Sequence, residues 1–321
     1  MYNMGQNVEK TISTFAFLAV LIPLVASILS KLMHSSSNLM LAKSSLDAVE
    51  EILMEKPLCE PDQGQLLADF SIELKHVSFC YEDGVKALDD VSLTIKPGTV
   101  TALVGESGGG KSTIANLVAR FLDVTQGTIR VGGVDLRNIS YWEWMKKVSI
   151  VFQDTSLLKM SIAQNVAMYR PDATREEIES ALKQAQCADI IEKLPDGMDT
   201  VIGTKGVYLS GGEMQRIALA RAILKDAPVI ILDEATAFAD AENEFLIQKA
   251  LATLLKGKTV LMIAHRLQTI TDADQILVLQ KGRIVERRTH DKLMQLRGVY
   301  ERMYQEYEHS ISWKIVGHKY V

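Results

Sequence analysis

The chain has 321 residues, of which 47% are hydrophobic, and its formal net charge is −5. That hydrophobic content is enough for a sizeable core. The acidic balance lacks the basic footprint of a nucleic-acid-binding protein, so we expect no nucleic-acid partner. The three cysteines, Cys59, Cys80 and Cys187, have neither a disulfide-framework spacing nor a zinc spacing, which fits a reducing compartment.

The first feature along the chain is a long uncharged segment. No charged residue lies between Lys10 and Lys31, and residues 11–30 as a helix would measure about 30 Å, the thickness of a bilayer's hydrocarbon core. We therefore predict a membrane-spanning helix, kinked at Pro23. A buried helix of a soluble domain is the alternative. A secretory signal peptide fits less well, because Lys10 gives only a weak basic region and no small-residue cleavage pattern follows.

The pattern then changes from uncharged to amphipathic and later to alternating. Apolar residues within 32–53 recur at three-and-four spacing, with charged residues on other faces. This predicts an amphipathic helix that continues the membrane segment, with a free coiled coil as the alternative. Alternation of apolar residues in 91–95 and in 129–131 predicts an antiparallel β portion.

A glycine-rich turn follows the apolar run Val100–Val104 and precedes a helical pattern. Strand, glycine turn and helix are the context of a P-loop, whose backbone N–H groups can point at phosphate oxygens because glycine has no Cβ in the way. Lys111 would reach the β- and γ-phosphates of ATP, and the Ser112 hydroxyl would be a ligand of Mg²⁺. The predicted nucleotide-binding residues of this turn are Gly105, Glu106, Ser107, Gly108, Gly109, Gly110, Lys111, Ser112 and Thr113.

A second glycine-rich element lies within the stretch 161–225, which is predicted to be mostly helical. Ser210 and Glu213 have capping-box spacing and mark a helix N-terminus. Capping alone does not explain Gly211 and Gly212, which cost conformational entropy but open backbone N–H groups to a phosphate. One nucleotide cannot occupy both glycine-rich turns of one monomer, so we expect ATP to be shared with another copy.

Acidic and basic side chains follow two further apolar runs. Val229–Leu232 predicts a central parallel strand that ends at Asp233 and Glu234, and in open α/β sheets ligands bind at that end. Asp233 would support Mg²⁺, and Glu234 is the candidate general base for the attacking water. The alternative is that the two carboxylates only end a strand at the surface. His265 follows the run Thr259–Ala264, where it could contact the γ-phosphate, although a lone histidine is more often structural.

Together these motifs resemble the ATP-binding cassette (ABC) family, specifically the nucleotide-binding domain of exporter-type transporters, over residues 65–308. The resemblance implies that Tyr81 stacks on adenine and that Gln153 touches Mg²⁺ or water and senses the membrane domain. It also implies that Asp240 is the D-loop acid and that His265 is the switch histidine. The signature of one subunit, Ser210, Gly211 and Gly212, would cover the γ-phosphate that the other subunit holds.

The family's site residues then map onto this sequence by position. The implied catalytic residues are Glu234, His265, Gln153 and Lys111. The implied metal ligands are Ser112, Gln153 and Asp233. The implied cofactors are ATP and Mg²⁺. The implied partners are a second ABC subunit in a homodimer or heterodimer, the membrane, and the transmembrane helices of a full transporter.

The expected fold is α/β: a P-loop NTPase core with an antiparallel β subdomain and a helical signature subdomain, preceded by a transmembrane helix. Residues 1–56 would be the last transmembrane helix and its cytoplasmic extension, 57–64 a linker, 65–308 the nucleotide-binding domain and 309–321 a C-terminal tail. Residues 276–285 are predicted to form a hairpin, and the tail a helix with an irregular end. The expected location is the cell membrane, with the ATPase domain in the cytoplasm.

The sequence departs from the commonest family pattern at Thr204, Glu213, Phe238 and Arg288, none of which carries a role in hydrolysis. Residues 236–244 look similar to the string in some siderophore-linked members. The main expectation is an ATPase subunit that couples ATP-driven dimerisation to substrate movement. The alternatives are an ABC ATPase switch without transport, and a truncated half-transporter that binds ATP without transporting.

Overall fold

The protein is represented by a computed structural model that describes residues 2–54, 58, 60–61, 65–82, 84–152, 155–203, 208–233, 241–264 and 266–317. Side chains at 2–9, 241–242 and 310–317 lie outside that description. The chain divides into two units, 1–58 and 59–321, and each is described by itself.

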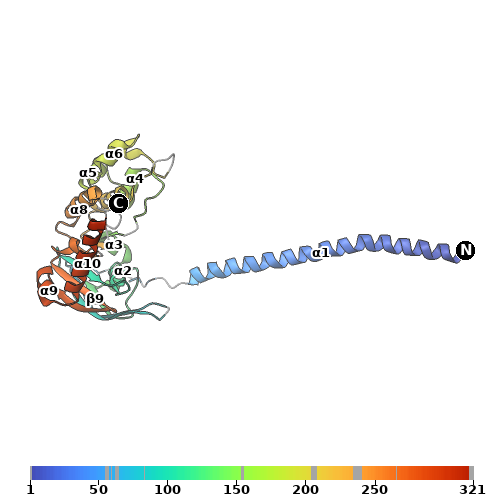
Figure 1. Ribbon diagram of the computed structural model, residues 1–321, viewed down its shortest axis with the longest axis horizontal. Coiled ribbons are helices and arrows are strands. Elements are labelled where there is room, and N and C mark those ends of the chain that lie inside the picture. Colours follow the sequence, from blue (N-terminus) through green and yellow to red (C-terminus); the bar gives the residue numbers. More distant parts are fainter. Residues whose placement is uncertain are drawn as a thin grey trace. The chain divides into compact units, whose positions relative to one another are not determined.

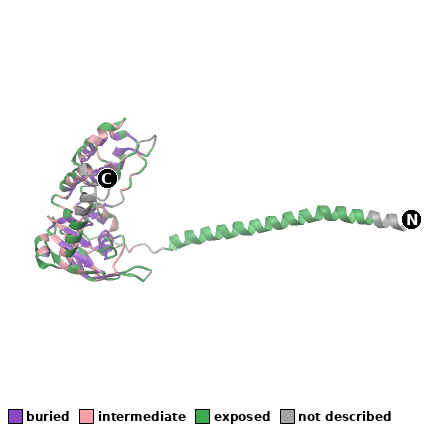
Figure 2. Ribbon diagram, in the orientation of Figure 1, coloured by how far each residue is buried: buried purple, intermediate pink, exposed green. Residues whose placement is uncertain are grey.

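The first unit is one helix, α1 (Tyr2–Met54), drawn in blue in Figure 1. It runs through Pro23 without interruption, so the predicted membrane segment and the predicted amphipathic helix form a single element. Every side chain described in this helix is exposed (Figure 2). By length and composition the helix is able to cross a membrane, and a helix satisfies its own backbone polar groups, as the interior of a bilayer requires.

The second unit contains an antiparallel sheet in the order β2-β1-β4-β5. Its strands are β1 (Ile72–Cys80), β2 (Lys86–Ile95), β4 (Gln126–Val131) and β5 (Val134–Asp135). Val91, Leu93 and Ile95 are buried on one face of β2, as side chains that alternate along a strand should be. The predicted antiparallel β portion is therefore confirmed.

A six-stranded sheet in the order β10-β9-β3-β8-β7-β6 forms the centre of the unit. Its strands are β3 (Val100–Gly105), β6 (Val148–Val151), β7 (Val229–Asp233), β8 (Thr259–Ile263), β9 (Gln275–Gln280) and β10 (Arg283–Arg288). All neighbours pair in parallel except β9 and β10. These two form the predicted hairpin, and Lys281 and Gly282 at its turn both have positive φ, the geometry of a type I′ turn.

Helices lie around this sheet, and α4, α5 and α6 gather at one end of the unit in Figure 1. The α-helices are α2 (Lys111–Val118), α3 (Tyr141–Lys147), α4 (Ile162–Val166), α5 (Arg175–Gln184), α6 (Ala188–Lys193), α7 (Gly211–Lys225), α8 (Ala241–Leu255), α9 (His290–Leu296) and α10 (Val299–Gly317). The 3₁₀ helices are η1 (Leu136–Asn138), η2 (Ala167–Tyr169), η3 (Gly197–Asp199) and η4 (Leu267–Ile270). The stretch 161–225 is mostly helical, as predicted.

The strands of the central sheet divide their side chains between two faces, because successive residues of a strand point in opposite directions. Leu277 and Leu279 of β9 join the cluster that holds the antiparallel sheet and α2. Ile276 and Val278 of the same strand join a cluster with α9 and α10. A further cluster packs α5, α7 and α8 against β7 and β8. The sheet is thus covered on both faces, and its carboxyl-end loops are left to form a site.

Candidate nucleotide site

The turn between β3 and α2 has the geometry that a phosphate cradle requires. Gly105, Gly108 and Gly110 all have positive φ, at 143°, 75° and 99°. A Cβ at Gly105 would lie 2.1 Å from the carbonyl oxygen of Leu279, so only glycine fits there. Since the helix begins directly after Gly110, its free N–H groups face the turn.

The β9–β10 hairpin supports the turn from behind. The N–H of Gly282 donates to the carbonyl of Gly109 at 3.2 Å, and the carbonyl of Gly282 accepts from the N–H of Asp89 at 2.9 Å. Gly109 also donates to the carbonyl of Glu106 at 3.1 Å. The hairpin, which is itself bonded to Asp89 of β2, therefore holds the loop in one conformation. A loop held in this way loses less entropy when a ligand binds.

Lys111 and its neighbours divide into buried and exposed residues. The Lys111 ammonium donates to the carbonyls of Gly105 and Glu106, at 2.8 Å each, and the residue is only 5% exposed. Glu106, Ser107, Gly108 and Ser112 are exposed, whereas Thr113 is buried. The ammonium is thus held inside the loop, and phosphate oxygens can replace the two carbonyls as its acceptors.

Tyr81, assigned to adenine by the family resemblance, lies beside the P-loop helix. Its hydroxyl is 3.1 Å from the Thr113 hydroxyl, and its ring meets the Phe79 ring edge-on with centroids 4.9 Å apart. The residue is 38% exposed. An aromatic ring next to the phosphate cradle can offer its face to a base.

The strand register places Asp233 level with Leu103, two residues before the P-loop begins at Gly105. Ile263 of β8 pairs with Leu103 of β3 on one side and with Asp233 of β7 on the other. Asp233 therefore lies at the carboxyl edge of the sheet, two strands from β3, and it is half-buried. The expectation that this strand ends beside the P-loop agrees with the geometry.

Four of the expected site residues lie outside the described residues: Gln153, Glu234, Asp240 and His265. The departures Thr204 and Phe238 also lie outside them. The described neighbour Phe152 is 51% exposed, and its ring stacks on that of Phe121 with centroids 6.4 Å apart. The N–H of Ala264 donates to the carbonyl of Leu103 at 3.0 Å, so the chain still follows β3 directly before position 265.

The signature helix α7 begins with the predicted capping box. Ser210 Oγ accepts from the N–H of Glu213 at 3.2 Å, and Glu213 Oε2 accepts from the N–H of Ser210 at 2.8 Å. Gly211 is exposed and Gly212 is buried. A Cβ at Gly212 would lie 2.9 Å from the Asn243 side chain in α8. Packing against Asn243 therefore explains why residue 212 is a glycine. Only Ser210 and Gly211, at the exposed end of the helix, remain as candidates for contact with a phosphate.

An ion pair that the sequence analysis did not find anchors this helix. The buried Arg216 donates to Asp189 Oδ1 at 2.7 Å and to Asp189 Oδ2 at 3.0 Å. Hydrogen bonds from Arg216 are the main reason that the pKa of Asp189 lies below its usual range. Such pairing joins α7 to α6, and no local spacing in the sequence indicates it.

A lysine at the other end of α7 connects it to the central sheet. Lys225 donates to the carbonyls of Met145 at 2.8 Å and Val148 at 2.5 Å. Its ammonium also lies 4.8 Å from the centroid of the Tyr169 ring, within the range of a cation–π contact. Burial lowers the pKa of Lys225. The helix that begins with the signature is thus held at both ends.

These features define a P-loop ATPase of the cassette type, with a signature helix in the same chain. Residues 88–237 match the family described as ABC transporter. The chain carries an exporter-type ATP-binding cassette, the ATPase domain of the ABC transporter family, and ATP is the nucleotide of such a cassette.

Individual relatives agree with this assignment. The chain is 52% identical to the mycobactin import ATP-binding/permease protein IrtA of Mycobacterium tuberculosis, over 81% of this chain and 30% of that protein. It is 44% identical to the ATP-dependent lipid A-core flippase of Legionella pneumophila, over 92% of this chain and 51% of that protein. The structure of a bacterial Atm1-family ABC exporter with ATP bound matches with a TM-score of 0.72 at 37% identity, over 78% of this chain and 44% of that one. The chain thus spans about half or less of the length of these relatives.

Proposed function

We propose that this chain hydrolyses ATP between two cassettes that face each other head to tail, and that it couples this cycle to substrate movement across a membrane. The observation that carries the proposal is the presence, in one chain, of a rigid P-loop and of a separate, exposed helix N-terminus at Ser210 and Gly211. The N-terminus of a 15-residue helix attracts anions. A second subunit can therefore place it on the γ-phosphate.

In this proposal the described residues bind and orient ATP. Tyr81 stacks on adenine, the loop from Gly105 to Thr113 holds the phosphates, and Lys111 moves its hydrogen bonds from loop carbonyls to phosphate oxygens. Ser112 and Asp233 are hard oxygen donors of the kind that suits Mg²⁺. When bound, Mg²⁺ would neutralise negative charge on the β- and γ-phosphates.

Four further residues complete the proposed chemistry. Glu234 polarises the attacking water as general base, and Gln153 orients Mg²⁺ or that water. His265 contacts the γ-phosphate, and Asp240 contributes from the D-loop to the shared interface. Hydrolysis then separates the two cassettes, because the γ-phosphate no longer joins P-loop and signature.

We further propose that α1 is the membrane-facing part of the chain. Residues 1–56 would comprise the last transmembrane helix and its extension, 57–64 the linker, 65–308 the cassette and 309–321 the tail. The cassette would lie in the cytoplasm and the remaining transmembrane helices in the full transporter. The length and apolar character of α1 and the membrane exporters among the relatives support this assignment.

The substitution Glu234→Gln in the reconstituted full transporter tests the base assignment. We expect ATP turnover to fall by at least about 100-fold, since positioned general bases contribute on the order of 10²–10⁴. ATP-driven dimerisation should persist. It can be measured by crosslinking cysteines introduced at the exposed Ser107 and Gly211.

Lys111→Ala is the control, because it should lose both ATP turnover and the ATP-dependent crosslink. Unchanged turnover in Glu234→Gln would refute the base. A wild-type chain that never crosslinks between the two elements would refute the shared site.

A second, finer proposal concerns the substrate. The chain is 48–54% identical to three mycobactin import proteins, compared with 43–44% for the lipid A-core flippases. We infer that an iron siderophore of the mycobactin class is the better substrate candidate. Stimulation of ATP turnover by the siderophore but not by lipid A would support it, and the reverse result would exclude it.

A further inference from the structure

An ion pair outside the P-loop joins two segments next to the proposed reaction centre. The Arg266 guanidinium donates through Nη1 to Glu244 Oε1 at 2.5 Å. The two side chains are 29% and 35% exposed, respectively, so neither is fully solvated. Solvent screens the attraction within a partly buried ion pair less than it screens the attraction within a pair on an open surface.

Both partners of this ion pair lie close in sequence to residues that are proposed to act in ATP hydrolysis. Arg266 directly follows position 265, just beyond the end of β8, and Glu244 lies in the first turn of α8, which begins directly after position 240. Positions 265 and 240 carry the proposed switch histidine and D-loop acid. The ion pair therefore links the segment next to the proposed switch histidine to the segment next to the proposed D-loop acid.

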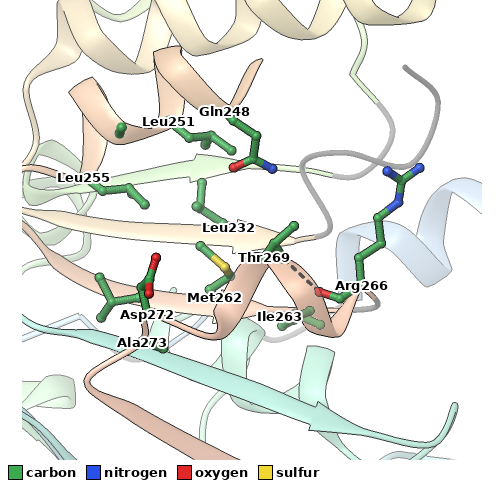
Figure 3. A pocket seen from close by; sticks show the side chains of 13 residues that line it. Leu232, Gln248, Leu251, Leu255, Met262, Ile263, Arg266, Thr269, Asp272 and Ala273 are labelled. Carbon is green, nitrogen blue, oxygen red and sulfur yellow. Dashed lines mark hydrogen bonds between the residues drawn. The ribbon is translucent and has the colours of Figure 1, made fainter. Parts of the chain in front are cut away.

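Arg266 is fixed on its backbone side as well. Its carbonyl accepts from the Thr269 N–H at 3.2 Å and from the Thr269 hydroxyl at 2.8 Å, a hydrogen bond that Figure 3 shows. Tyr307 of α10 lies near the pair: burial raises the pKa of Tyr307, while Arg266 lowers it and Glu244 raises it. Three elements therefore meet at this ion pair.

The packing beside the pair is incomplete. A cavity of about 250 Å³ lies between α8 and the segment after β8, and Arg266 stands at one end of it (Figure 3). Val100 and Met262 line this cavity. Both residues pack against the apolar cluster that contains α8 and against the apolar cluster that contains α10. None of its described lining residues belongs to the P-loop, so the cavity is not the nucleotide site. The cavity separates described side chains of α8 from those of this segment, and the ion pair bridges the two.

We propose that the Arg266–Glu244 ion pair holds residues 265 and 240 in the relative placement that ATP hydrolysis needs. This inference rests on the proposed function. Arg266 and Glu244 are both positioning residues, since neither needs to touch the nucleotide. A reacting group displaced by about 1 Å can lose on the order of 10²-fold in rate, so a single lost contact beside two such groups has a measurable effect.

The test uses the full chain reconstituted in its transporter, with Arg266→Gln, Glu244→Gln and the exchanged pair Glu244→Arg with Arg266→Glu. We expect each single change to lower kcat for ATP about tenfold and to change KM by less than about twofold, because the contact orients groups rather than binding ATP. The exchanged pair should recover most of kcat. The melting temperature should change little, since a partly exposed ion pair contributes little to stability.

Arg170→Gln is the matched control. Arg170 pairs with Glu177 at 2.9 Å, with side chains 35% and 42% exposed, and it lies in the helical part of the cassette. Its kcat should equal that of the wild type. The inference is overturned if Arg266→Gln behaves like this control, or if KM rises as much as kcat falls, or if the exchanged pair is no better than the single changes.

The proposed function fails separately from this inference. An active wild type whose turnover survives Glu234→Gln would contradict the base assignment while leaving the Arg266 comparison valid. An inactive wild type would overturn both.

Discussion

At the scale of single residues, the glycines of the second unit differ in how strongly their surroundings exclude a Cβ atom. Gly105 has φ 143° and a Cβ there would meet the Leu279 carbonyl, whereas Gly133 has φ 83° and nothing lies within 4 Å of its Cβ position. Gly133→Ala should therefore cost only the backbone strain, about 1–2 kcal/mol. Gly105→Ala adds a steric clash to this strain.

We expect Gly105→Ala to lose more than about 3 kcal/mol of unfolding free energy, because the clash displaces the backbone in addition to a backbone strain of about 1–3 kcal/mol. The variant should also lose ATP binding. Urea unfolding and binding of a fluorescent ATP analogue measure the two effects. Equal losses in Gly105→Ala and Gly133→Ala would contradict the clash.

Cys187 predicts a pH dependence of stability. Burial raises the pKa of its thiol from 9.0 to about 12, so the folded protein keeps the proton that the unfolded chain releases. The associated stability is fully present below pH 9 and is lost as the pH rises toward 12. Each pH unit above 9 should remove up to about 1.4 kcal/mol.

The matched variant for this prediction is Cys187→Ala, because it leaves every other titrating group in place. In reducing buffer, the unfolding free energy of the wild type should fall more steeply between pH 9 and 10.5 than that of Cys187→Ala. Parallel curves would show that the buried thiol contributes nothing to the pH dependence.

At the scale of elements, the buried side chain of Arg216 contributes to the attachment of α6 to α7. Removing Asp189 leaves the Arg216 guanidinium, which is 1% exposed, without its carboxylate. Breaking a buried pair costs about 3–5 kcal/mol, but Asp189 is 41% exposed, so solvent screening reduces the expected loss for Asp189→Asn to about 1–3 kcal/mol. Hydrogen exchange in α6 should increase with it.

The control is Arg175→Gln, which breaks the exposed pair of Arg175 with Asp199 in the same helical part. Because both of those side chains are exposed, the unfolding free energy should change little. A loss in Arg175→Gln as large as that in Asp189→Asn would contradict the special role of the buried guanidinium.

Elements with local signals were predictable from the sequence. The P-loop turn, the capping box at Ser210 and Glu213, and the hairpin turn at Lys281–Gly282 each depend on residues within a few positions of one another. The strand order was not predictable in the same way, because β3 pairs with β8 and β9 from far along the chain.

The site shows the same division. Tyr81 and Thr113 are brought together by the sheet, and the reason for glycine at Gly212 is a side chain of α8, Asn243. The ion pairs of Arg216 with Asp189 and of Arg266 with Glu244 also join separate elements. Single-sequence spacing contains no signal for such contacts, whereas the identity of the phosphate-binding residues follows from local chemistry.

At the scale of the whole molecule, α1 sets the conditions under which the chain is soluble. The described side chains of this helix are exposed and many are large and apolar, such as Phe15, Ile22, Leu29 and Leu39. Contiguous apolar surface of this extent requires a membrane or partner helices. We expect the chain to float with membranes and to need detergent for extraction.

Removal of residues 1–54 provides the comparison for this prediction. The shortened chain should leave the membrane fraction in carbonate or high salt. A full chain that stays monomeric in water without detergent would contradict the membrane assignment of α1.

The support of the P-loop by the β9–β10 hairpin has a consequence for biosynthesis. Strand β3 and its turn emerge early from a ribosome, but both neighbours of β3, β8 and β9, and the Gly282 N–H that holds Gly109 are translated near the end of the cassette. Long-range pairing of this kind delays folding. A nascent chain stalled before residue 275 should therefore not retain ATP, and nucleotide capture by the growing polypeptide would begin only as its last strands leave the exit tunnel.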